Sequence, residues 1–448
     1  MSFVTRLRQS FWFLPAVLCA LAVILAESLI VLDRRLDDID LGPVSCLITR
    51  VGESGSRDLL GAIAGSMLTV ASTTFSITIA VLALSSSTYG PRLVRNFMAD
   101  RGNQLVLGVF VATFLYSLLV LRSVRVLDEG GEDTFVPHLA VNVAVLLAVL
   151  SIGVLVYFIH HISDSVQVWT LARQVRTDLL ATVDRLYPEK IGRDSQDVED
   201  ADGRQDVPRR LDVDGAPVAS QQTGYVQGVD HEDLLTLANK HDLVVSLRIR
   251  PGHHTIEGST MAVGWPGDRV DDDLLAEIRK AVRIGKARTP HEDVEFSVLL
   301  LEEMAVRALS PSTNDPYTAI NALDDLSAGL VRLADRRTPS PYRYDDQGQL
   351  RVVAPGVMLT DLLDHVLDAM RLYAIEHPLV LHRTLELVEQ VGAAVGQPAL
   401  RARMDTQIRR LLEAFTLSSP QDYDIEQLTR HADRVRRSLA GPALGAHP

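Results

Sequence analysis

The sequence contains few cysteines and few lysines. Cys19 and Cys46 are the only cysteines among 448 residues. Cys19 lies inside an apolar run and Cys46 lies outside it, so we expect no disulfide between them. Two cysteines also cannot supply a zinc site by themselves. Only four of the 44 basic residues are lysines, which we interpret as a codon preference for arginine rather than as an arginine-specific site.

The charge balance and the missing motifs exclude several classes of function. The formal net charge is −13 at pH 7, whereas nucleic acid requires a concentrated basic surface. The sequence has no G-x-S-x-G elbow, P-loop, dinucleotide fingerprint or H-E-x-x-H motif. We therefore predict a protein that is not an enzyme, uses no cofactor or metal, and binds no nucleic acid.

Four apolar segments occupy the first third of the chain. They run from about Phe11–Leu32, Leu59–Leu84, Leu105–Leu121 and His138–Ile159. Each is close to the ~20 mostly apolar residues that a helix needs to cross a bilayer. The first is longer than a signal-peptide core, so we expect an uncleaved span. The pattern predicts a four-helix transmembrane domain over residues 1–162.

The arginines predict the orientation of these spans. Arg92, Arg95 and Arg101 fill the short loop between the second and third segments, whereas residues 128–133 of the next loop are acidic. Because cytoplasmic loops are enriched in basic residues, we expect both termini on the cytoplasmic side. The three arginines accompany apolar residues, as in a helix at the membrane surface. They either anchor the chain or form the cytoplasmic mouth of a pathway.

The second segment carries a regular series of hydroxyl groups. Ser66, Thr69, Thr73 and Ser76 are spaced three, four and three residues apart, which places them on one side of a helix. Such a stripe packs against another helix or, around an oligomer axis, lines a pore. Glu27 is a charged residue inside the first span, where it either reaches the headgroups or faces a polar cavity.

The rest of the chain reads as a cytoplasmic α+β domain. We expect a helical stalk over residues 163–191, an acidic flexible linker over 192–222, a small β-rich module over 223–268 and a helical bundle over 269–448. Asp230 is a predicted helix cap, and Thr289–Glu292 has the spacing of a capping box.

One corner of the helical region concentrates small polar residues. Pro311 closes one predicted helix, Asp315 caps the next and Pro316 occupies its first turn. The side chains at this corner that we single out are Ser312, Thr313, Asn314 and Asp315. They either hold a small polar ligand beside free helix N–H groups or form a structural corner or subunit contact.

Three sequence stretches carry a resemblance to a known family. They are RLVRNFMADRGNQ after the second span, GYVQGVDHEDL together with LRIRPG, and RALSPSTNDPYTAINALD. Together they resemble the bacterial predicted membrane proteins catalogued as domain of unknown function 2254. The resemblance covers nearly the whole chain. It implies an inner-membrane protein with four spans and a cytoplasmic C-terminal region, and it implies no activity.

Two functions fit these features. The first is a homo-oligomeric channel or transporter, in which the hydroxyl stripe faces the symmetry axis and the cytoplasmic domain gates the path of an ion or small ligand. The alternative is a membrane-anchored scaffold or sensor whose cytoplasmic domain binds a protein or small ligand. The lipid bilayer is a partner in both, and we expect a homo-oligomer.

Overall fold

The chain folds into two compact units, residues 1–171 and residues 172–448. The computed structural model describes residues 12–36, 52–89, 101–124, 135–165, 168–187, 207–336, 338–418 and 420–441. We call the two parts the four-helix unit and the C-terminal unit. Each is described by itself.

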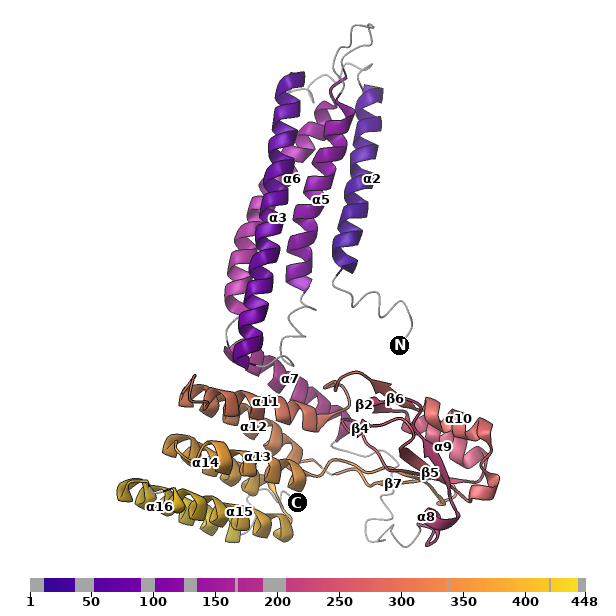
Figure 1. The fold of residues 1–448 in the computed structure, drawn as a ribbon, viewed down its shortest axis with the longest axis vertical. Coiled ribbons are helices and arrows are strands. Elements are labelled where there is room, and N and C mark those ends of the chain that lie inside the picture. Colours follow the sequence, from indigo (N-terminus) through magenta and orange to yellow (C-terminus); the bar gives the residue numbers. More distant parts are fainter. Residues whose placement is uncertain are drawn as a thin grey trace. The chain divides into compact units, whose positions relative to one another are not determined.

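The four-helix unit contains the four long apolar helices shown in Figure 1. They are α2 (Phe13–Leu36), α3 (Glu53–Tyr89), α5 (Arg101–Ser123) and α6 (His138–Ser165). All four are long and apolar enough to cross a membrane. Helices α3, α5 and α6 each cover one predicted span and extend beyond it. Helix α2 begins at Phe13, two residues after the predicted start, and ends at Leu36, four residues after the predicted end. At 1.5 Å per residue, α3 is about 55 Å long.

Helix α5 is the centre of this unit, because it packs against α2, α3 and α6. Its buried residues include Val106, Phe110 and Val120. Gly108 lets α2 approach closely: a Cβ at this position would lie 2.6 Å from Leu18 Cδ1 and 3.1 Å from Pro15 Cα. Small residues allow this kind of backbone approach between apolar helices.

Helix α7 (Val168–Leu186) crosses the boundary between the two units at residue 172. The C-terminal unit combines two sheets with helices. The five-stranded sheet has the order β1-β5-β3-β8-β7, and the three-stranded sheet has the order β4-β2-β6. Pairing is antiparallel except between β3 and β8, which are parallel. The strands are β1 (Ala216–Ala219), β2 (Gly224–Val229), β3 (Val244–Leu247), β4 (His254–Thr255), β5 (Thr260–Trp265), β6 (Val282–Gly285), β7 (Tyr342–Tyr344) and β8 (Leu350–Val353).

Short helices complete this part of the unit. They are α8 (Leu211–Asp214), α9 (His231–Lys240), the single 3-10 turn η3 (Gly267–Arg269) and α10 (Asp272–Lys280). Side chains of α9 and α10 share one hydrophobic core with both sheets, including Leu234, Ile278, Val245 and Met261. A second, smaller core on Leu211, Val244, Val263 and Leu350 involves α8.

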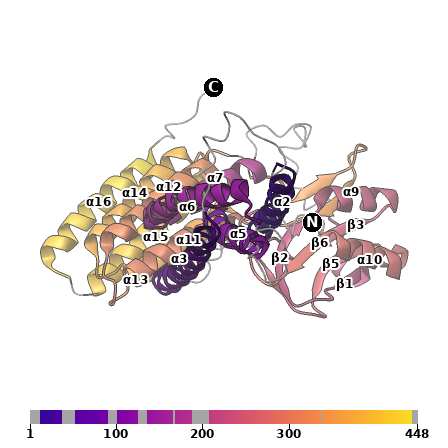
Figure 2. The ribbon, with the colours of Figure 1, turned by 90° about the horizontal axis from the view of Figure 1, so that it is seen from above.

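Six longer helices form three antiparallel pairs in two layers. They are α11 (Val294–Ala308), α12 (Pro316–Ala334), α13 (Leu359–Tyr373), α14 (Pro378–Ala394), α15 (Pro398–Leu417) and α16 (Asp422–Ala440). In one layer α12 packs on α14 and α14 on α16, and in the other α11 packs on α13 and α13 on α15. Figure 2 shows both rows. Each pair therefore covers the apolar side of the next.

A buried ion-pair network ties the strands to the first helical pair. Arg288 binds both carboxylate oxygens of Asp293 at 2.7 and 2.8 Å. Asp293 in turn caps α11 by accepting the Phe296 N–H at 3.0 Å. Gly252, in the turn between β3 and β4, has φ +92° and lies against both residues of the pair, so a side chain there has no room.

The structure changes three details of the sequence interpretation. Residues 207–222 of the expected linker contain α8 and β1, since β1 pairs with β5; residues 192–206 lie outside the described residues. The β-rich part extends beyond residues 223–268, because β6, β7 and β8 belong to the same sheets. The capping box at Thr289–Glu292 is wrong, since Asp293 caps α11 and Glu292 accepts the Val229 N–H at 3.1 Å. The caps at Asp230 and Asp315 are confirmed.

Candidate functional site

The two sides of α3 differ sharply in character. Leu60, Ala64, Met67, Ala71, Thr74 and Thr78 are buried in the four-helix unit. The opposite side is exposed and bears only small or hydroxyl side chains along its centre: Ala62, Gly65, Thr69, Thr73, Ser76, Ala80 and Ala83. We call these seven residues the outer face of α3. Their spacing averages 3.5 residues, the repeat of a helix packed along its length against another.

The predicted hydroxyl stripe lies on or beside this outer face. Ser66, Thr69, Thr73 and Ser76 are all exposed. Three of the hydroxyls donate to carbonyls four residues earlier in their own helix, at 2.9 Å for Thr69, 3.0 Å for Thr73 and 2.9 Å for Ser76. The protons are therefore satisfied within α3, and the oxygens keep lone pairs directed outward.

The exposed sides of α2 and α6 are different. On α6 they carry Leu146, Val149, Leu150, Ile152 and Ile159, and on α2 they carry Leu21, Ile24 and Val31. Large branched side chains of this kind suit contact with lipid tails. The outer face of α3 is thus small and polar along its centre, although the same helix exposes large apolar side chains beside it, namely Leu68, Phe75, Ile77, Ile79 and Leu84.

Several polar side chains are buried inside the four-helix unit, among them Asn103, Gln104, Thr113, Ser117 and Ser151. Thr113 and Ser151 lie 3.3 Å apart, and Tyr116 donates to the Ala140 carbonyl at 2.9 Å. Asn103 is 5% exposed, and neither atom of its amide has a hydrogen-bond partner in the structure as described. Val106 and Phe110, both fully buried, separate Asn103 from Thr113. A path through one copy would have to cross this apolar layer.

Glu27 has an ionic partner that the sequence did not indicate. Its carboxylate lies 3.5 Å from the guanidinium of Arg122 on α5, and both side chains are more than half exposed. Nearby, Asp33 caps α6 by accepting the Leu139 and Ala140 N–H groups at 3.1 and 3.0 Å. Both contacts tie helices together at one end of the unit. Sequence inspection could have found Asp33 only by knowing which helix begins beside it.

The predicted cytoplasmic mouth falls mostly outside the described residues. Arg92 and Arg95 are not described, and Arg101 is exposed at the first residue of α5.

The Ser312–Asp315 corner is a tight turn between α11 and α12. Asn314 has a positive φ of +46°. The Ser310 hydroxyl donates a hydrogen bond to the Thr313 hydroxyl at 3.2 Å. Asp315 accepts the Thr318 N–H at 3.1 Å and the Thr318 hydroxyl at 2.6 Å, and these bonds lower the pKa of its carboxyl. Both carboxylate oxygens of Asp315 thus accept hydrogen bonds from Thr318, within the corner itself. Ser312, Thr313 and Asn314 are exposed, so the corner is a surface turn and not an enclosed pocket.

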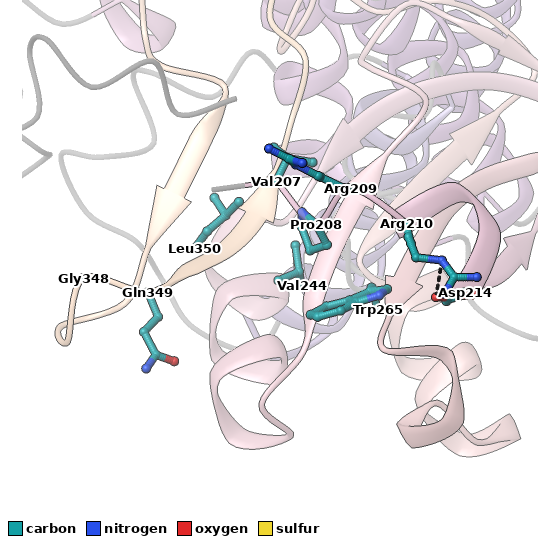
Figure 3. Close-up of a pocket in the computed structure, with 10 residues that line it drawn as sticks. All are labelled: Val207, Pro208, Arg209, Arg210, Asp214, Val244, Trp265, Gly348, Gln349 and Leu350. Carbon is teal, nitrogen blue, oxygen red and sulfur yellow. Dashed lines mark ion pairs between the residues drawn. The ribbon is translucent and has the colours of Figure 1, made fainter. Parts of the chain in front are cut away.

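A cavity of about 570 Å³ lies beside the five-stranded sheet (Figure 3). Val244, Leu350 and Trp265 give it an apolar floor. Arg209 and Arg210 lie at its rim, and Arg210 pairs with Asp214 at 3.1 Å. Sequence reasoning missed this site, because its residues come together only through the pairing of β3, β5 and β8. An apolar floor with charged groups at the edge is a general feature of small-ligand sites.

In the part of the chain that is described, no three His, Cys, Asp or Glu side chains gather to hold a metal.

Comparison with known proteins covers both units. The family model described as predicted membrane protein, domain of unknown function 2254, matches residues 8–390. The chain belongs to this family. It is 32% identical over 398 residues to the uncharacterized protein Rv1290c of Mycobacterium tuberculosis and to the uncharacterized protein Mb1321c of Mycobacterium bovis. The match spans 88% of this chain and 74% of each relative. No solved structure matches.

The family description agrees with the four apolar helices, and the matched region also includes the strands and the first helical pairs of the C-terminal unit. The resemblance seen in the three sequence stretches is therefore confirmed.

Proposed function

We propose that this protein is a homo-oligomeric channel or transporter of the bacterial inner membrane, in which the outer faces of several α3 helices line the path. The carrying observation is a contrast between the exposed sides of the helices: along its centre the exposed side of α3 carries small and hydroxyl groups, flanked by Leu68, Phe75 and Ile79, whereas α2 and α6 expose mainly Leu, Ile and Val. Hydroxyl and carbonyl oxygens facing a common axis replace part of an ion's hydration shell. Small side chains leave space around that axis.

The interior of a single copy supports placing the path between copies. Phe110, Phe158 and Met67 fill the space between α3, α5 and α6. The C-terminal unit would open and close the path by acting through α7, which begins three residues after α6 ends at Ser165. Helix α7 is bound to the first helical pair by Arg176 and Asp325 at 3.0 Å and by Asp184 and Arg332 at 2.9 Å. Movement of the helical pairs would reach α6 along this connection.

The test uses neighbouring threonines on opposite sides of α3. Thr73 is exposed and Thr74 is buried, and Thr→Val removes the hydroxyl while nearly keeping the shape. Purified protein in planar bilayers should conduct ions, Thr73→Val and Ser76→Ala should change the conductance, and Thr74→Val should not. An effect of Thr74→Val alone would place the path inside one copy. Bilayers that stay silent at all voltages and ligand conditions would reject the proposal.

A second candidate is a membrane-anchored sensor or scaffold, favoured by the cavity at Trp265 and by the self-satisfied hydroxyls of α3. In that case α3 helices pack directly on one another and enclose no water. A cysteine at Thr69 would then resist water-soluble thiol reagents in the assembled protein. Under the channel proposal the same cysteine reacts, while a cysteine at Leu150 on the exposed side of α6 does not.

A further inference from the structure

The last helix of the C-terminal unit meets its neighbour through a pair of histidines. His382 lies on α14 and His431 lies on α16, and these two helices pack side by side (Figure 2). Their Nδ1 atoms are 2.8 Å apart, and their rings are nearly parallel, with centroids 5.2 Å apart. His431 is 9% exposed and lies on the buried side of α16 with Leu428, Ala432 and Val435. The contact is thus a hydrogen bond inside a helix interface.

A hydrogen bond between two Nδ1 atoms limits the charge that the pair can carry. A neutral imidazole has one N–H donor and one acceptor nitrogen, whereas an imidazolium has two donors and no acceptor. At least one ring must therefore be neutral to accept the bond. A single added proton keeps the bond, because an imidazolium can donate to a neutral ring. A second proton places two N–H groups and two positive charges face to face at 2.8 Å, so the rings must separate.

The surroundings of the pair favour neutral rings. Four charged side chains act on the two imidazoles: Glu386 and Glu389 of α14, and Asp424 and Arg434 of α16. The carboxylates favour a charged histidine, but Glu386 is already paired with Arg383. Burial, followed by the neighbouring positive charges, lowers the pKa of both histidines below its ordinary value. The pair therefore carries no charge at neutral pH.

The other helices packed in this region contribute carboxylates that already have arginine partners. These pairs are Asp324 of α12 with Arg383 of α14, Asp405 of α15 with Arg436 of α16, and Asp364 of α13 with Arg403 of α15. Burial acts to raise the pKa of the Asp405 carboxyl, but the Arg436 guanidinium outweighs it and holds the pKa below its ordinary value. This ion pair survives mild acid, so α16 stays joined to α15 when the histidines become charged.

We propose that the His382–His431 contact makes the attachment of α16 to α14 sensitive to acid: the interface is closed while one ring is neutral and opens when both are protonated. The two protons bind in coupled steps, the second below the ordinary histidine pKa of about 6.5. Helix α16 packs mainly on α14 and α15, so it can leave α14 while the first two helical pairs stay together. Opening uncovers an interface that also contains Leu439 packed over Gly392. The proposal concerns the C-terminal unit alone and does not depend on the channel.

The experiment measures the distance between α14 and α16 by double electron–electron resonance in the full-length protein, with Cys19 and Cys46 replaced by serine. Nitroxide labels are attached after Gln390→Cys on α14 and Arg437→Cys on α16, both at exposed positions. The control label pair uses Gln390→Cys with Ala328→Cys, which is exposed on α12. Between about pH 7.5 and about pH 4.5, on the two sides of the ordinary histidine pKa, we expect longer distances to appear between α14 and α16. The distance between α12 and α14 should stay unchanged.

The variant His431→Asn separates the effect of the pair from a general effect of acid. An amide offers both a donor and an acceptor and carries no charge, so it can bond to His382 in either protonation state. We expect the long distances at low pH to disappear in this variant. The reciprocal His382→Asn should behave alike and replaces the first variant if that one does not fold. His377→Asn, at the N-cap of α14, is the control and should keep the response to acid.

Three results would overturn the proposal. One is a distance between α14 and α16 that is the same at both pH values. Another is a response to acid that persists in the asparagine variants of His382 and His431, which would assign it to other groups. The third is an equal change between α12 and α14, which would mean that acid loosens the whole bundle.

Discussion

At the scale of single residues, burial decides which of the many arginine–carboxylate pairs matter. Asp293 is 2% exposed and Arg288 is 17% exposed, whereas the Arg248–Asp212 pair is largely exposed. Removing one partner of a buried pair leaves a charge without solvent or counter-ion, which costs about 3–5 kcal/mol. An exposed pair contributes about 0–1 kcal/mol.

We therefore expect Asp293→Ala to destabilise the C-terminal unit strongly, because the change also removes the cap of α11. The loss should be about 3–5 kcal/mol, measured by chemical unfolding of the purified protein. Asp212→Ala is the control and should cost less than about 1 kcal/mol. Similar losses for the two variants would show that the network around Asp293 is not a structural centre.

Glu302 on α11 makes stability depend on pH. Burial raises the pKa of its carboxyl to about 7. His365 Nε2 is 3.4 Å from Oε2, but in the described structure Oε2 has no hydrogen bond. The folded state holds the proton more tightly than the unfolded state, whose ordinary value is about 4.3. Stability is therefore greatest below that value, falls as the pH rises towards 7, and is constant above it.

The variant Glu302→Gln keeps the shape of the protonated acid and removes the charge. We expect it to match the wild type at pH 5 and to be more stable at pH 8, by about 3 kcal/mol from 1.36 kcal/mol per pKa unit. Unfolding midpoints measured from pH 5 to pH 8 check this. A wild-type midpoint that does not fall over this range would contradict the raised pKa.

Local residue roles were predictable, and distant ones were not. Asp230 and Asp315 each cap a helix by accepting the N–H of the residue three positions later, so sequence spacing was enough to identify them. The Arg351 guanidinium donates to the carboxylate of Asp345, six residues earlier, and to that of Asp242, 109 residues earlier, each at 2.7 Å. Nothing in the sequence around Asp242 indicates that partner. The Glu27–Arg122 pair is hidden for the same reason.

At the scale of elements, apolar length and helical periodicity predicted helices well and sheets poorly. Strand β8 pairs in parallel with β3 although about a hundred residues separate them. No local pattern encodes such a pairing. The side of α3 that is buried was equally hard to predict, since Thr74 and Thr78 on the inner side resemble Thr69 and Thr73 on the outer side.

Close packing of α2 on α5 gives a test at this scale. Gly108→Ala places a Cβ against Pro15 and Leu18, and such overpacking costs about 1–3 kcal/mol. Gly153→Ala on α6 is the matched control, because nothing lies within 4 Å of its Cβ position. The control should gain up to about 1 kcal/mol from helix propensity. Thermal stability in detergent measures both variants, and a gain at Gly108 would show that α2 does not pack this tightly.

At the scale of the whole molecule, the two units should unfold separately. Each has its own core: Val106 and Phe110 belong to the four-helix unit, and Val245 and Leu323 belong to the C-terminal unit. Inside a bilayer the backbone groups of helices have no water to bond with, so urea cannot unfold them there. The strands and helical pairs of the C-terminal unit have no such protection.

We expect urea to unfold the reconstituted protein in one transition of the C-terminal unit while the helical circular dichroism of the four-helix unit persists. Asp293→Ala should shift that midpoint, whereas Gly108→Ala should leave it unchanged and lower only thermal stability in detergent. The two substitutions lie in different units, so their effects should add in the double variant. Loss of all helical signal in a single transition, or a shift of the urea midpoint by Gly108→Ala, would mean that the units fold as one.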